Sequence, residues 1–154
     1  MQFSDSMKRL VALASLLLLL LGGPALTQPV VNLPPVSTIT FAPGSSASTV
    51  NGQATPGSRN LYYVLAKAGQ TLMVSVSSQA NVTFQVYSAD TTLAKATDGK
   101  PLIEGKTLPG AGASDNAKAW VGAIPRDGNY LIAIDVAGGA GSGPTPYGLT
   151  VSLQ

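Results

Sequence analysis

From Val36 onward, apolar and polar residues alternate in short runs that glycine, proline, asparagine and aspartate separate. In the run 71–77, Leu72, Val74 and Val76 fall on one side and polar residues or Met73 fall on the other. Because strand side chains point alternately to opposite faces, this pattern is typical of half-buried strands. The predicted strands are Ser37–Phe41, Ser48–Gln53, Leu61–Ala66, Thr71–Ser77, Val82–Tyr87, Ala119–Ile124, Tyr130–Val136 and Tyr147–Leu153. The sequence therefore predicts an all-β domain, a single jelly-roll-like β-sandwich of about eight antiparallel strands.

Turn and loop residues punctuate the strands. The segments 67–70 and 125–129 each hold a glycine between two strands and are predicted hairpin turns, in which Asp127 bonds the backbone of its own turn. The longer connection 89–118 is expected to contain a small hairpin, with arms 91–96 and 102–107 around Asp98-Gly99, and then a flexible run over 109–114. The glycine-rich run 137–146 is predicted to be a mobile loop.

The N-terminus has the three parts of a secretory signal peptide. Lys8 and Arg9 follow Met7, the predicted true start, and an apolar run over 10–21 ends at Gly22-Gly23-Pro24-Ala25. As a helix that run would reach roughly 18 Å, short of the roughly 30 Å hydrocarbon core, although an uncleaved anchor stays open as an alternative. Cleavage after Ala25 or Thr27 would release a secreted or periplasmic protein with no stable membrane anchor. The predicted organisation is a signal peptide over 1–27, a Pro-rich linker over 28–36 and the sandwich domain over 37–154.

The chain has no cysteine. A lipid anchor attached through a thioether is therefore excluded, and the exported domain must be held by its core rather than by disulfides. Charged residues make up only 10% of the chain and do not cluster, so a nucleic-acid partner is not expected.

Histidine is also absent, which removes the commonest general base and the usual partner of a catalytic serine. A carboxylate pair or a Ser-Lys dyad would remain, yet no spacing marks two acids as partners. The mature carboxylates are Asp90, Asp98, Glu104, Asp115, Asp127 and Asp135. We therefore predict no enzyme, no catalytic residues and no cofactor.

A calcium site is one alternative, because Asp90, Asp98, Asp127 and Asn129 place oxygen donors in predicted turns and loops. The EF-hand spacing is missing, and polar turn residues facing solvent explain the same pattern. We predict no metal and keep these four residues as weak calcium candidates.

Four segments of the chain resemble a known family. They are FAPGSSASTVNGQATPGSRNLYYVLAKAGQTLMVSVSS, NVTFQVY, AWVGAIPRDGNYLIAIDV and PYGLTVSLQ. The sequence is similar to the bacterial pre-peptidase C-terminal (PPC) domain and to the related inhibitor-of-g-type-lysozyme proteins. In these, a tyrosine strand leads into an Ala-Gly-Gln turn and a W-x-G-x-[LI]-P segment leads to a second tyrosine strand.

The resemblance implies a compact β-sandwich without catalytic machinery. The PPC group is appended to secreted enzymes, whereas a stand-alone, exported copy in the inhibitor group blocks the cleft of a lysozyme. This chain is expected to be a stand-alone copy, which favours the inhibitor group. One departure counts against it: a lysozyme cleft is lined by carboxylates, and the run 137–146 carries no charge that would complement them.

The candidate binding residues form one cluster and two single positions. Arg59, Asn60, Tyr62 and Tyr63 begin a strand, where alternation puts the two tyrosines on opposite faces and predicts that one of them packs in the core. Trp120 matches a packing position of the family, and burial with its N–H bonded is favoured over sugar stacking. Arg126 is the other arginine of the mature chain. The lysines at 95, 100, 106 and 118 give at most a weakly basic face, and we expect them to be solvated.

These observations predict a non-enzymatic, secreted or periplasmic binding module whose partner is a protein, with inhibition of a g-type lysozyme as the specific form. Two alternatives stay open. One is a structural or adhesive envelope protein that binds cell-wall polysaccharide or a surface protein, and the other is an accessory domain of a separately encoded secreted hydrolase.

Overall fold

A computed structural model describes residues 35–95, 101–137 and 143–154. The predicted signal peptide, the linker up to residue 34, and Asp98 and Lys100 lie outside the described residues. The elements are β1 (Val36–Ile39), β2 (Ala47–Ala54), β3 (Asn60–Ala66), β4 (Thr71–Ser77), β5 (Val82–Tyr87), β6 (Thr92–Lys95), β7 (Pro101–Glu104), a 3-10 helix (Ala113–Asp115), β8 (Ala119–Ala123), β9 (Gly128–Val136) and β10 (Thr145–Leu153). No helix in these ranges is long and apolar enough to cross a membrane.

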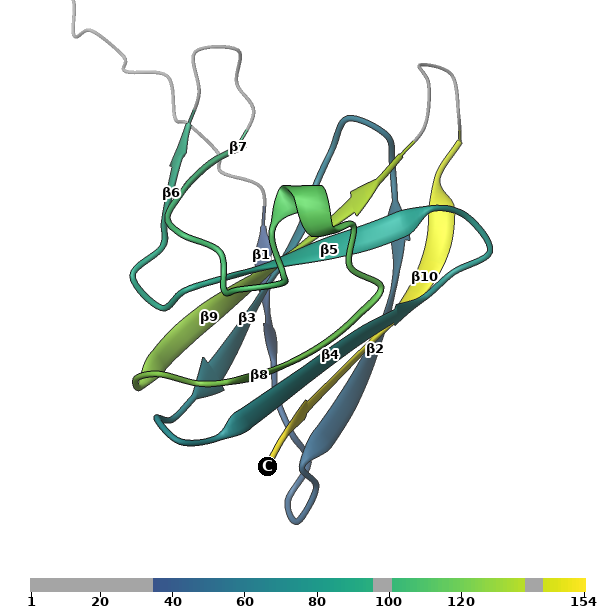
Figure 1. Cartoon of the computed structure of the whole chain (residues 1–154). Coiled ribbons are helices and arrows are strands. Elements are labelled where there is room, and N and C mark those ends of the chain that lie inside the picture. Colours follow the sequence, from purple (N-terminus) through teal and green to yellow (C-terminus); the bar gives the residue numbers. More distant parts are fainter. Residues whose placement is uncertain (1–34, 96–100, 138–142) are drawn as a thin grey trace, which may run out of the picture. The chain divides into compact units, whose positions relative to one another are not determined.

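The strands form two four-stranded sheets and one separate hairpin (Figure 1). One sheet has the order β1-β3-β9-β5, the other has the order β2-β10-β4-β8, and β6 pairs with β7. The two larger sheets pack face to face, which confirms the predicted β-sandwich. The pairing differs from the prediction at one edge, because β1 runs parallel to β3. The chain path permits parallel pairing, because β2 lies in the other sheet and β1 and β3 are therefore not joined by a hairpin.

Strand alternation supplies the main core. Leu72 and Val74 of β4 face Val64 and Tyr130 of the opposite sheet within one cluster of buried side chains. Burying a leucine or valine side chain stabilises a fold by about 1.5–3 kcal/mol, so this layer holds the domain together without disulfides.

The central strand β9 departs from simple alternation. Leu131, Ile132, Ala133 and Ile134 are all fully buried. Ile132 and Ile134 face the main core, whereas Leu131 and Ala133 face outward into a second cluster that Leu93 and Ile103 of the β6–β7 hairpin cover. This hairpin matches the one predicted from the sequence, and it explains why β9 is a nearly continuous apolar run.

The flexibility predicted for 109–114 is wrong. The backbone N–H of Val86 donates to the carbonyl of Ala111 over 3.0 Å, and the N–H of Leu108 donates to the carbonyl of Val86 over 2.8 Å. Ala111 is fully buried. This segment therefore lies along the edge of β5 and satisfies its backbone groups, and its small residues suit that close approach.

The structure also shows the turn 67–70, the partner of Asp127 and part of the predicted loop 137–146. The turn 67–70 forms as predicted, with Gly69 at φ +84° and a 3.1 Å hydrogen bond from the N–H of Gln70 to the carbonyl of Lys67. The carboxylate of Asp127, however, accepts from the N–H of Ala68 over 2.8 Å, so it bonds the neighbouring turn rather than its own. In the predicted loop 137–146, β10 already begins at Thr145, and residues 138–142 lie outside the described part.

Candidate binding site

The predicted cluster at the start of β3 is distributed over both faces of its sheet. Tyr62 is 6% exposed and belongs to the main core, whereas Tyr63 is half-buried against the second apolar cluster. The two tyrosines therefore lie on opposite faces, as the alternation indicates. Their phenol rings pack within the domain and leave little aromatic surface for a partner.

A hydrogen-bond network joins Tyr62 to the other sheet. The hydroxyls of Tyr62 and Tyr147 lie 2.6 Å apart, and the side-chain amide of Asn60 donates to the Tyr147 hydroxyl over 2.7 Å. The same amide donates to the backbone carbonyl of Gln53 over 2.8 Å. Burial and the hydrogen bond with Tyr62 raise the pKa of Tyr147 well above its ordinary value. This network fixes β2, β3 and β10 to one another at one end of the sandwich.

Arg59 belongs to a second network on the outer face of the β1-β3-β9-β5 sheet. Its Nε donates to the carboxylate of Asp135 over 2.9 Å, and the other oxygen of Asp135 accepts from the amide of Gln85 over 2.8 Å. The Tyr87 hydroxyl donates to the Gln85 carbonyl oxygen over 2.5 Å, and burial raises the pKa of Tyr87. The positive charge of Arg59 is thus already paired by a half-buried carboxylate.

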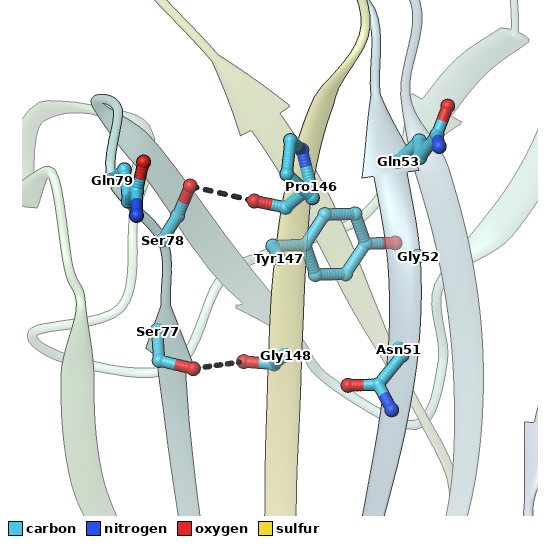
Figure 2. Close-up of a pocket in the computed structure, with 9 residues that line it drawn as sticks. All are labelled: Asn51, Gly52, Gln53, Ser77, Ser78, Gln79, Pro146, Tyr147 and Gly148. Carbon is cyan, nitrogen blue, oxygen red and sulfur yellow. Dashed lines mark hydrogen bonds between the residues drawn. The ribbon is translucent and has the colours of Figure 1, made fainter.

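A broad, open depression lies on the outer face of the other sheet, at the same end of the domain (Figure 2). Its volume is about 890 Å³. The lining residues come from β2, β4 and the segment after it, and β10: Asn51, Gly52, Gln53, Ser77, Ser78, Gln79, Pro146, Tyr147 and Gly148. No member of this set is charged, and most carry an amide or a hydroxyl.

Two glycines lie at the depression: Gly148 is at an outward position of β10, whereas Gly52 is at an inward position of β2. Gly148 pairs with Asn51 on one side and Ser77 on the other. At Gly52, a Cβ atom would lie 2.5 Å from the hydroxyl oxygen of Tyr147, so the tyrosine ring occupies the space that a side chain would need. Sequence reasoning missed these residues, although Asn51 and Gln53 alternate along β2 and Gly148 is a glycine at an outward position of β10.

Trp120 and Arg126 lie apart from this end. The indole N–H of Trp120 donates to the carbonyl of Pro109 over 2.9 Å, and its ring packs against Gly122 and the main core. Arg126 Nη2 lies 2.6 Å from the Asp90 carboxylate, and its side chain is 51% exposed. Its backbone carbonyl accepts from the Tyr130 hydroxyl over 2.9 Å. Of the six predicted binding residues, Arg126 offers the most accessible charge.

The calcium candidates that the structure describes make separate contacts. Asp90 pairs with Arg126, and hydrogen bonds from the Ser88 hydroxyl and from Arg126 lower the pKa of its carboxyl group to about 2. Asp127 bonds the 67–70 turn, Asn129 lies exposed on β9, and Asp98 is outside the described residues. Within 35–95, 101–137 and 143–154, no three histidine, cysteine, aspartate or glutamate residues are placed to hold a metal ion.

No protein-family model matches the chain, and no curated protein matches it. Its structure is similar to that of Aeromonas hydrophila PliG, a periplasmic lysozyme inhibitor of g-type lysozyme, with a TM-score of 0.58 and 26% identity over 77% of this chain and 96% of that one. PliG of Salmonella Typhimurium matches with a TM-score of 0.54 and 12% identity over 79% and 99%. A mutant of the Escherichia coli inhibitor matches with a TM-score of 0.54 and 15% identity over 77% and 97%.

These similarities confirm the resemblance inferred from the four sequence segments. The second and third neighbours share the fold with little sequence identity. The Aeromonas hydrophila inhibitor shares both the fold and about a quarter of the aligned residues, and the present chain spans almost its whole length.

Proposed function

We propose that this chain is an exported, non-enzymatic protein-binding module that inhibits a g-type lysozyme. The observation that carries the proposal is the similarity to the Aeromonas hydrophila inhibitor, at 26% identity over 96% of that protein. The whole inhibitor therefore has a counterpart in one sandwich domain of this chain. The sequence has no histidine or cysteine. Three of its carboxylates each make a structural contact: Asp90, Asp127 and Asp135. Both observations are consistent with binding rather than catalysis.

Export is part of the proposal. The signal-peptide pattern before Gln28 would direct the chain out of the cytoplasm, and the three inhibitor neighbours are periplasmic proteins. A lysozyme inhibitor has to meet its target outside the cytoplasm, so the predicted extracytoplasmic localisation agrees with the proposed target.

Among the predicted binding residues, Arg126 is the one we assign to the interface. Its pairing with Asp90 is exposed, and exposed ion pairs contribute little because solvent screens them, so a partner carboxylate can replace Asp90. Arg59 is held by the half-buried Asp135, and Tyr62 and Trp120 serve packing. A guanidinium group binds carboxylates in a bidentate manner, which suits the carboxylate-lined cleft of a lysozyme.

The proposal is tested by measuring the binding of the exported protein to a goose-type lysozyme, alongside Arg126→Ala and, as a matched control, Lys118→Ala, an exposed residue before β8, whereas Arg126 follows β8. We expect a tight complex that Arg126→Ala weakens at least about tenfold and Lys118→Ala leaves unchanged. A complex that both variants weaken equally would refute the role of Arg126. No complex at all would refute the function.

A further inference from the structure

The outer face of the β2-β10-β4-β8 sheet carries no charge. Its outward positions, read from the strand registers, are Ala47, Thr49, Asn51, Gln53, Pro146, Gly148, Thr150, Ser152, Thr71, Met73, Ser75, Ser77, Ala119, Val121 and Ala123. The outer face of the other sheet is partly covered by the β6–β7 hairpin and holds the Arg59–Asp135 pair. A charged ligand would find no counter-ion among these outward residues, whereas an uncharged polar ligand would find hydroxyls and amides.

The polar groups of this face converge at Gly148. A Cβ atom built on Gly148 would lie 3.0 Å from the hydroxyl oxygen of Ser77 and 3.4 Å from the amide oxygen of Asn51. The two side chains therefore lean over the glycine from the neighbouring strands, as Figure 2 shows. A hydroxyl group placed above the Gly148 backbone would be within hydrogen-bonding reach of both.

The lining of the depression is held in place before any ligand arrives. The Ser78 hydroxyl donates to the carbonyl of Pro146 over 2.8 Å, and the Ser77 hydroxyl donates to the carbonyl of Gly148 over 3.4 Å. Below the sheet, Tyr147 is fixed by Tyr62 and Asn60. A binding surface on paired strands loses little conformational entropy when a ligand binds.

We propose that this depression binds an uncharged oligosaccharide. A sugar ring carries hydroxyls that both donate and accept, and the amides of Asn51, Gln53 and Gln79 do the same. The apolar C–H face of a sugar can pack on the ring of Pro146, which lines the same depression. An open volume of about 890 Å³ lies within the range of small-ligand sites, and its openness suits a chain that passes across the sheet.

The test is an NMR titration of the exported, isotopically labelled protein with chitotetraose and, separately, with cellotetraose. Few direct hydrogen bonds and an open site predict a dissociation constant of about 1 mM for at least one of these sugars. The backbone amide signals of Asn51, Ser77 and Gly148 should shift, whereas those of Tyr63 and Leu131 on the other sheet should not.

Two variants test the location of the site. Gly148→Val fills the floor of the depression, and Asn51→Ala removes one converging amide while leaving the fold unstrained. Each should weaken sugar binding at least about fivefold. Thr71→Val, at a distant outward position of the same sheet, should bind as the unaltered protein does.

Three outcomes would overturn the proposal: no shifts with either sugar at about 10 mM, shifts confined to other residues, or equal binding by Asn51→Ala and the unaltered protein. Because no lysozyme is present in this titration, its failure is independent of the proposed inhibitory function.

Discussion

The hydroxyl groups of Tyr62 and Tyr147 lie 2.6 Å apart in the core and link the two sheets of the sandwich. Each hydroxyl has one proton to donate, and the Asn60 amide supplies a further donor to Tyr147. The pair therefore satisfies polar groups that would otherwise be buried without partners, at the end of the domain where the depression lies.

Removing one hydroxyl of this pair should destabilise the domain to a degree that depends on which one is removed. Tyr62→Phe leaves Tyr147 bonded to Asn60 and should cost about 1 kcal/mol of unfolding free energy. Tyr147→Phe deprives both Tyr62 and Asn60 of a partner and should cost about 1–3 kcal/mol. Chemical denaturation of both variants and of the double variant measures the coupling, and additive losses would contradict a direct bond.

Gly52 should tolerate no side chain. A Cβ atom there would lie 2.5 Å from the Tyr147 hydroxyl oxygen, so Gly52→Ala should lower the unfolding free energy by about 1–3 kcal/mol. Gly143→Ala is the matched control, because a Cβ at that position meets nothing within 4 Å. Equal thermal midpoints for the two variants would show that the ring of Tyr147 does not occupy this space.

The raised pKa of Tyr147 predicts a loss of stability at alkaline pH. Its folded pKa lies above the ordinary value of about 10, so the neutral phenol contributes fully below about pH 10, and its contribution is lost as the pH rises toward the folded pKa. The unfolding free energy should therefore fall above about pH 10, by up to about 1.4 kcal/mol per pH unit from this group. Denaturation at several pH values should give a shallower slope for Tyr147→Phe, and an unchanged slope would contradict the assignment.

The signal-peptide prediction is open to direct measurement. Expression in a bacterium from the full sequence should yield an exported protein that begins at Leu26 or Gln28, as determined by the intact mass of the secreted or periplasmic fraction. A protein that stays in the membrane with residues 10–21 attached would support the uncleaved anchor instead.

The architecture was predictable from the sequence because alternation is a local signal. The spacing alone predicts a buried face in two strands, formed by Leu72, Val74 and Val76 in β4 and by Leu149, Val151 and Leu153 in β10. The parallel pairing of β1 and the packing of Ala111 on β5 were not predictable, because they depend on contacts between distant parts of the chain.

The candidate site was predictable only in part. Tyr62 and Tyr63 could be assigned to opposite faces, yet the partner of Tyr62 is Tyr147, far along the chain. Likewise, Gly148 lies between Asn51 and Ser77 only because β10 pairs with both β2 and β4. A single sequence does not specify strand order, so the depression could not be found before the sheet was known.

The central claim is tested most directly by titrating the exported protein into a goose-type lysozyme that is lysing bacterial cell walls. The proposed function predicts that the rate of clearing falls in proportion to added protein and reaches zero near one equivalent, while Arg126→Ala requires at least about tenfold more protein. An undiminished lytic rate at a large excess of folded protein would contradict the claim.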